Sequence, residues 1–201
     1  MVKADCGGCN GCSRCCHGMG NSIILDPYDV YRMTTGMGKS MQELLAASVE
    51  LNVVDGVILP NLKMQGTEEA CAYLDEEGRC SIHPYRPGIC RLFPLGRYYE
   101  NGGFSYFLQT GECAKENRSK IKVSKWIDTP DLTRNQQFTL QWHDLLHAME
   151  ERLTGEDEGK QREENLLLLR LFYLLPYEGT IDFYTQFTER MEHWNGKNGQ
   201  I

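Results

Sequence analysis

Cys9-Asn10-Gly11-Cys12-Ser13-Arg14-Cys15-Cys16 is a CxxCxxCC run, and Cys6 precedes it at the same two-residue spacing. Two intervening residues let the backbone curl so that successive sulfurs approach one centre. Gly7, Gly8 and Gly11 permit the backbone angles that such a curl needs. Buried thiolates repel one another, whereas a bound cation deprotonates them and holds them together. The run therefore predicts metal binding.

The spacing of the run bears on which metal it binds. Four cysteines reproduce the C-x2-C-x2-C-x3-C spacing of bacterial ferredoxins: Cys6, Cys9, Cys12 and Cys16. His17 stands where those proteins carry a proline, and zinc ribbons separate two CxxC pairs by a longer stretch. The spacing thus favours an iron–sulfur cluster of the 4Fe–4S type and leaves zinc as the alternative. The side chains of adjacent Cys15 and Cys16 point in different directions, so we do not expect both to bind the same iron. Either one of them is not a ligand, or the pair links two metal sites.

The other four cysteines follow at longer intervals, at Cys71, Cys80, Cys90 and Cys113. Cys71 and Cys80 flank a predicted hairpin, and Cys113 ends a second one. Because a hairpin brings its ends together, these positions predict further ligands. The nine cysteines suffice for two four-thiolate sites with one left over, or for one site and a redox pair.

Composition excludes several classes of protein. Nine cysteines among 201 residues are too few for a disulfide scaffold, which carries about 8–10% cysteine. A net charge of −7 argues against a dedicated nucleic-acid binder. The longest apolar run, residues 166–175, is about half of the ~20 residues that a membrane helix needs, and the N-terminus lacks the apolar segment of a secretory signal. We therefore expect a cytoplasmic protein whose partners are a metal ion or cluster and a protein redox partner, with neither nucleic acid nor membrane among them.

Helix and turn signals predict an α+β fold. Residues 1–20 resemble an irregular loop. The predicted elements are then helices at 28–34 and 40–49, short strands between 53 and 62, hairpins at 72–82 and 97–109, and helices at 131–153, 162–175 and 181–194. We expect two parts, a cysteine-cluster metal-binding domain over 1–115 and a helical extension packed on it over 116–201.

Several separated motifs resemble a known family. The CxxCxxCC run is followed by Cys71-x-Tyr-Leu, by Gly78-Arg79-Cys80-Ser81-Ile82 and by Arg86-Pro87-Gly88-Ile89-Cys90-Arg91-Leu92-Phe93-Pro94. In this order they resemble the cysteine-cluster proteins of the YkgJ type, which are zinc- or iron-chelating domains, over roughly residues 6–115. The resemblance implies eight metal ligands: Cys9, Cys12, Cys15, Cys16, Cys71, Cys80, Cys90 and Cys113.

This chain departs from the family pattern at two positions. Cys6 is an additional cysteine, and His83 stands where the family carries an aromatic residue, so His83 is either a ninth ligand or a simple substitution. Arg86 and Arg91 flank the turn before Cys90, where guanidinium groups would stabilise a negatively charged cluster. Both are candidate cofactor-binding residues. The alternative is that they form surface ion pairs with acidic neighbours: Glu76, Glu77 or Glu112.

Three functions stay open. The first is an iron–sulfur protein acting in electron transfer, redox sensing or metal handling. The second is a structural zinc protein whose helical half binds a partner. The third is an enzyme, either an iron–sulfur oxidoreductase or a methyltransferase-like protein, since the cluster also resembles the C-terminal part of flagellin lysine methylases. His143 and His147 share a helix face but lack the glutamate of the HExxH motif, so no catalytic residue is assigned.

Overall fold

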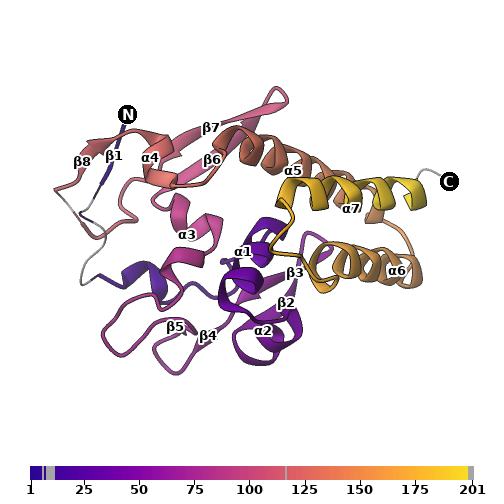
Figure 1. Cartoon of the computed structure of the whole chain (residues 1–201), viewed down its shortest axis with the longest axis horizontal. Helices are drawn as coiled ribbons and strands as arrows, with labels where there is room; N and C mark the ends of the chain where they lie inside the picture. Colours follow the sequence, from indigo (N-terminus) through magenta and orange to yellow (C-terminus); the bar gives the residue numbers. More distant parts are fainter. Residues whose placement is uncertain (6, 8–11, 116, 199–201) are drawn as a thin grey trace.

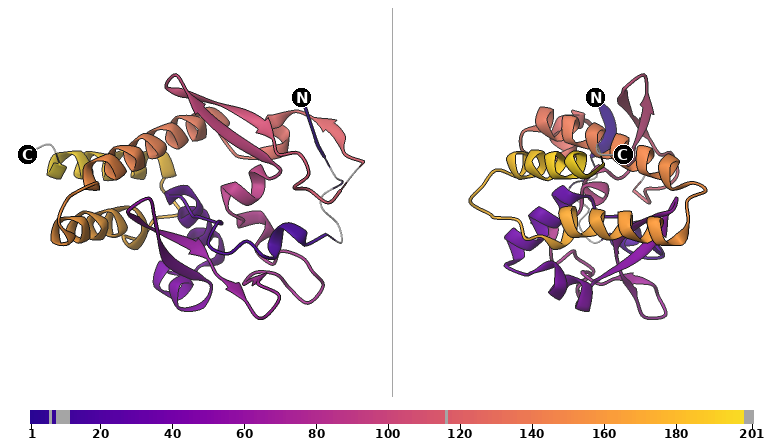
Figure 2. Two further views of the ribbon diagram at one scale, coloured as in Figure 1. Left: turned by 180° about the vertical axis from the view of Figure 1, so that it is seen from behind. Right: turned by 90° about the vertical axis from the view of Figure 1, so that its right-hand side faces the viewer.

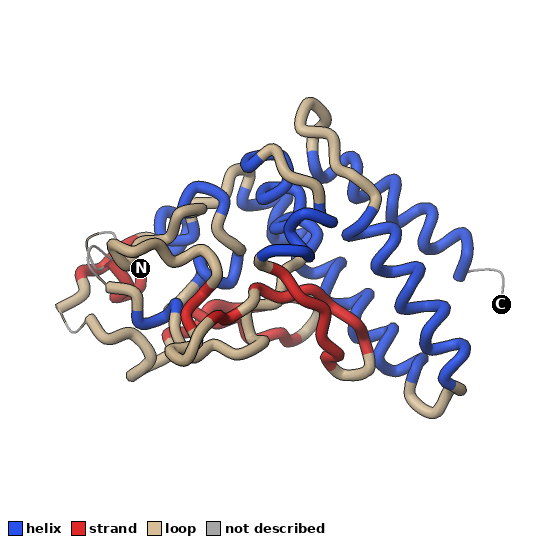
Figure 3. Tube along the Cα trace, turned by 90° about the horizontal axis from the view of Figure 1, so that it is seen from below, coloured by secondary structure: helices blue, strands red, loops and turns tan. Residues whose placement is uncertain are grey.

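The computed structural model describes residues 1–5, 7, 12–115 and 117–198. The chain is a mixed α+β fold in which strand pairs and small helices come first and long helices follow. The helices are η1 (Arg14–Cys16), α1 (Pro27–Met37), α2 (Met41–Ala47), η2 (His83–Tyr85), α3 (Gly88–Leu92), α4 (Val123–Ile127), α5 (Leu132–Leu153), α6 (Glu158–Leu169), the π-helical η3 (Arg170–Leu174) and α7 (Phe183–Asn198). The strands are β1 (Val2–Asp5), β2 (Val49–Val54), β3 (Val57–Leu62), β4 (Met64–Gln65), β5 (Ala70–Cys71), β6 (Leu95–Glu100), β7 (Gly103–Leu108) and β8 (Ser119–Ile121). Figures 1 and 3 show the long C-terminal helices at one end and short strands and loops near the N-terminus at the other.

Reciprocal capping boxes begin the first two helices. The Asp26 carboxylate accepts a hydrogen bond from the backbone N–H of Asp29 at 2.8 Å, and the Asp29 carboxylate accepts one from the N–H of Asp26 at 3.2 Å. Ser40 and Glu43 exchange the same pair of bonds at the start of α2. Two orphan donors are satisfied in each box, so the predicted helix starts are confirmed. α1 runs further than predicted because its left-handed cap is Gly38, with φ of 64°.

Two hairpins follow the turn signals in the sequence. β2 and β3 pair antiparallel across Asp55-Gly56, and β6 and β7 pair across Asn101-Gly102. All four turn residues have positive φ, as the type I′ turns of tight hairpins require. The hairpin predicted at 72–82 is reduced to a single bridge between Leu74 and Cys80, and the ladder in that region is β4–β5 instead.

The first residues do not form the predicted loop throughout. β1 pairs antiparallel with β8, and Val2 lies opposite Ile121. The Ser119 hydroxyl donates a hydrogen bond to the Asp5 carboxylate at 3.2 Å, which joins the two strands across 114 residues of sequence. A four-residue strand carries too little alternation to be recognised alone, and its partner is set only by the tertiary fold.

The main hydrophobic core takes residues from both sides of position 116. α5, α6 and α7 pack beside one another in Figures 1 and 2, and the Phe138 ring of α5 meets the Phe187 ring of α7 with centroids 4.8 Å apart. The buried Asn165 of α6 accepts a hydrogen bond from the N–H of Ile58 at 2.6 Å and donates one to the Gly56 carbonyl at 3.2 Å. These bonds hold the β2–β3 turn against the helical half.

The three C-terminal helices occur where they were predicted, with boundaries that move by up to four residues: α6 begins at Glu158, and α7 continues to Asn198. α6 begins at Glu158 because the Asp157 carboxylate accepts hydrogen bonds from the N–H groups of Gly159 and Lys160. The five-residue helices α3 and α4 were not predicted, since a single turn shows no periodicity. Within the described residues, no helix combines the length and the apolar character needed to cross a bilayer.

Candidate metal centre

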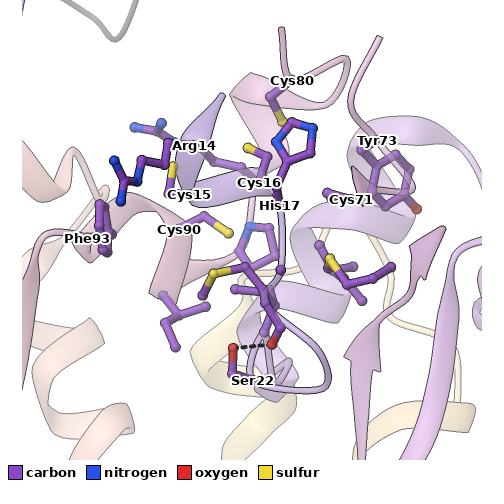
Figure 4. A pocket seen from close by; sticks show the side chains of 18 of the residues that line it. Arg14, Cys15, Cys16, His17, Ser22, Cys71, Tyr73, Cys80, Cys90 and Phe93 are labelled. Atoms are coloured by element: carbon purple, nitrogen blue, oxygen red, sulfur yellow. Dashed lines mark hydrogen bonds between the residues drawn. The ribbon is translucent and has the colours of Figure 1, made fainter. Parts of the chain in front are cut away.

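A cavity of about 790 Å³ opens beside η1. Five thiols line it: Cys15, Cys16, Cys71, Cys80 and Cys90. Much of the remaining wall is apolar, and the lining includes the thioethers of Met19 and Met64 and the ring of Phe93. In Figure 4, Cys15, Cys16, Cys80 and Cys90 are drawn around one part of the hollow, with the His17 ring among them.

Two smaller cavities share residues with the large one. The first, of about 270 Å³, is lined by five of the cysteines and by His83, the cysteines being Cys12, Cys15, Cys16, Cys80 and Cys90. The second, of about 30 Å³, is lined by Cys12, Cys15 and Cys113, so Cys15 borders all three. Seven of the eight predicted ligands therefore lie in one region, all as free thiols. Cys9 and the additional Cys6 lie outside the described residues.

Short backbone pairings bring the cysteine segments together. An antiparallel bridge between His17 and Ala70 lays the end of η1 beside β5, whose last residue is Cys71. The bridge between Leu74 and Cys80 then returns the chain toward Cys71. Each bridge is too short to be a sheet, yet each fixes the separation of two thiol-bearing segments.

α3 positions Cys90 from the other direction. It is followed directly by the β6–β7 hairpin, and its last turn packs against α4 in a small second core that contains Leu92, Leu95 and Ile127. The Trp126 indole N–H donates to the carbonyls of Leu92 and Phe93, both at 3.2 Å. The C-terminal end of α3 is thereby attached to the segment that follows Cys113.

Burial keeps most of these thiols protonated. It raises the pKa of Cys71, of Cys80 and, most strongly, of Cys90. The negative charge of Asp29 raises the pKa of Cys90 further. Ligation by these three residues would therefore release protons, because a metal binds the thiolate.

Cys15 differs from its neighbours. Its pKa is lowered to about 6, first because the Cys16 thiol donates a hydrogen bond to it, and then through its backbone contact and the charges of Arg86 and His17. The same bond raises the pKa of Cys16. Cys15 is also exposed, so a thiolate stands at the edge of the large cavity.

The donor set suits a soft metal. Thiolates select zinc, copper(I) and iron–sulfur clusters, whereas magnesium and calcium take oxygen ligands. Among the residues that the structure describes, no group of three or more His, Cys, Asp or Glu side chains is arranged to hold a metal ion as it stands. The thiol side chains would reorient around a bound group, and their backbone positions bring them to the same cavities.

The two candidate arginines lie in different surroundings. Arg86 lines both larger cavities, and its charge lowers the pKa of Cys15 and opposes the raised pKa of Cys80. Arg91 is buried at 5% exposure, and its guanidinium carbon lies 5.8 Å from the centroid of the Tyr28 ring. Within the described part of the chain, no ion pair joins either arginine to the acidic alternatives: Glu76, Glu77 or Glu112.

The histidines separate into two groups. His17 makes a 3.0 Å contact from Nδ1 to the Ser13 carbonyl, which can only accept, so Nδ1 carries a proton. Burial lowers the pKa of His83, which lines the second cavity. His143 lies on α5, its ring stacked on Tyr99 at 3.8 Å, and lines none of the three cysteine cavities.

Two acids of the first capping box, the half-buried Asp26 and the buried Asp29, are not among the functional candidates predicted from the sequence. Burial, and then the charge of Asp29, raises the pKa of Asp26 to about 7, while burial also raises that of Asp29. An acid three residues after an N-cap signals a capping box, but no sequence signal reports that Asp29 also reaches Gly88, 59 residues away.

Comparison with known proteins gives one match. A family model described as "CxxCxxCC: Putative zinc- or iron-chelating domain" matches residues 8–139, about two thirds of the chain. No curated protein and no solved structure matches.

Proposed function

This chain belongs to the CxxCxxCC family of zinc- or iron-chelating domains, and from that premise we propose that its cysteines hold an iron–sulfur cluster. The observation that carries the proposal is the grouping of five thiols around one cavity of about 790 Å³. The sulfur ligands come from four separate segments and line a cavity with room for a group larger than a single ion. The ferredoxin-like spacing of the CxxCxxCC run supports the same assignment.

The surroundings support a redox role for this cluster. Cys15 is exposed, so a cluster bound to it would lie near the surface, within reach of a protein redox partner. Arg86 lines the cavity and supplies positive charge, which stabilises a negatively charged cluster and raises its reduction potential. We therefore propose electron transfer or redox sensing ahead of metal handling, with Arg86 rather than Arg91 as the arginine that acts on the cluster.

The enzymatic alternative receives less support. It anticipates a polar pocket between the two halves of the chain beside the metal. The residues lining the large cavity all lie between Arg14 and Glu112, and none comes from α5, α6 or α7.

Anaerobic purification followed by absorption spectroscopy and elemental analysis tests the proposal. We expect a brown protein with iron and inorganic sulfide in stoichiometric amounts. A colourless protein with about one or two zinc ions per chain would instead support a structural zinc site that stabilises the fold through ligation.

A further inference from the structure

One face of α1, a helix without cysteines, contacts the segment that carries Cys80 and Cys90. The face consists of Asp29, Arg32 and Gly36, spaced i, i+3 and i+7 so that they line up along one side of the helix. Each of the three meets a different point between the two cysteines. α1 lies beside α3 in Figure 1.

Asp29 makes the contact nearest to Cys90. Its Oδ1 accepts a hydrogen bond from the backbone N–H of Gly88 at 2.7 Å, and Asp29 is only 2% exposed. Gly88 is the first residue of α3, two positions before Cys90. A buried hydrogen bond to the start of a five-residue helix fixes where that helix begins.

Arg32 and Gly36 make the contacts nearer to Cys80. The Arg32 guanidinium donates to the Pro84 carbonyl in η2. Gly36 lies against the Tyr85 ring so closely that a Cβ at this position would overlap the ring atoms. A glycine inside a helix reduces helix stability, so its presence here accords with a need for space.

We propose that this face of α1 positions Cys80 and Cys90 for the metal centre, with Asp29, Arg32 and Gly36 as positioning residues. The proposal rests on the proposed function, in which both thiols are ligands. Holding the intervening segment at residues 84, 85 and 88 orders it before ligation, so that less conformational entropy is lost when the cluster binds.

The competing explanation is that α1 only adds stability through packing. Gly36→Ala separates the two, because alanine favours the helix while its methyl group displaces the Tyr85 ring. Gly196→Ala is the matched control, a glycine in α7 with open space around the position of its Cβ. The matched control for Asp29→Ala is Asp157→Ala, which removes the N-cap side chain of α6.

The first measurement uses the full chain stripped of metal. Iodoacetamide labels the thiols, and peptide mass spectrometry gives the rate at each cysteine. We expect Gly36→Ala and Asp29→Ala to change the rates of Cys80 and Cys90 several-fold and to leave Cys113 unchanged. Asp29→Asn keeps an acceptor for the Gly88 N–H, although not the second acceptor that receives the Asp26 N–H, and should restore rates at Cys80 and Cys90 close to those of the wild type. The two control variants should match the wild type throughout.

The second measurement is iron and zinc per chain after purification. We expect Gly36→Ala and Asp29→Ala to lose most of the metal and the control variants to retain it. Unchanged rates at Cys80 and Cys90, or equal changes at every cysteine with a lowered unfolding midpoint, would overturn the positioning role. A wild-type chain without metal would overturn the proposed function alone, since the labelling pattern is measured on the metal-free chain.

Discussion

The Tyr173 hydroxyl donates a hydrogen bond to the Leu25 carbonyl at 3.0 Å, which joins η3 to the residue just before the first capping box across 148 positions of sequence. Both residues are buried, with Tyr173 at 1% and Leu25 at 0% exposure. The bond attaches the helical half directly to the start of α1. The same helix contacts the segment between Cys80 and Cys90 through Asp29, Arg32 and Gly36.

We expect Tyr173→Phe to lower the free energy of unfolding by about 1–3 kcal/mol, because the buried Leu25 carbonyl loses its partner. Urea denaturation followed by circular dichroism and by tryptophan fluorescence measures the change. Both probes should report the same shifted midpoint, since one core is shared by the two halves. A shift in one probe alone would contradict this shared core.

Asn165→Ala should destabilise the chain by roughly 2 kcal/mol, because it leaves the Ile58 N–H and the Gly56 carbonyl without their side-chain partner. Thermal unfolding measures the loss. Asn165→Asp keeps an acceptor for the Ile58 N–H but loses the amide donor and adds a charge near the core, so it should not restore stability. A wild-type midpoint for either variant would contradict the role given to this side chain.

Cys12→Ser and Cys90→Ser should each lose metal and solubility, because both remove predicted ligands that line the cysteine cavities. Cys6→Ser should be mild, since Cys6 is not part of the ligand set that the family resemblance implies. Metal per chain and the soluble fraction after expression check both expectations. An equal loss from Cys6→Ser would mean that the ferredoxin-like spacing, not the eight-ligand set, describes the site.

Asp26→Asn should make the chain more stable at pH 8 and reduce its dependence on pH. The pKa of Asp26 is raised in the folded chain to about 7, from an ordinary value of about 4. The protonated form thus favours folding, and this contribution is complete below about pH 4 and is lost as pH rises through 7. Asparagine keeps an acceptor for the Asp29 N–H and carries no charge.

Denaturation of the metal-free wild type and of metal-free Asp26→Asn at pH 5 and at pH 8 isolates the effect of Asp26. The thiols are the same in the two proteins, so their contribution to the pH dependence cancels in the comparison. We expect the wild type to lose on the order of 1–3 kcal/mol more than Asp26→Asn over this range. Equal losses in the two chains would show that Asp26 is already ionised in the folded state at pH 5.

The parts of the fold that sequence predicted well are those determined by near neighbours. The helix predicted from residue 40, the strands between 53 and 62 and the hairpin at 97–109 each depend on a cap or turn whose residues lie within a few positions of one another. β1 and α3 were missed because neither is long enough to show a pattern, and each depends on distant partners. The division of the chain at residue 115 stays a prediction.

The candidate site, like the fold, was predicted from the sequence only in part. Cys90 and Arg91 are neighbours in the sequence, and both were predicted to face the cluster. Successive residues of a helix point about 100° apart. Cys90 therefore lines the cavity while Arg91 packs over Tyr28. Which of two adjacent residues faces a site depends on how the helix docks, and that follows from contacts such as the one between Asp29 and Gly88.

The sequence by itself determined the chemistry of this protein: a set of soft sulfur donors whose order and spacing identify a metal-chelating family. Only the tertiary structure decided which thiols share a cavity, which arginine lies among them and which helix face holds the loop between Cys80 and Cys90. The reason is physical. Caps, turns and ligand spacing are set by bonds within a few residues, whereas the placement of Cys16, Cys71 and Cys90 depends on packing between segments far apart in the chain.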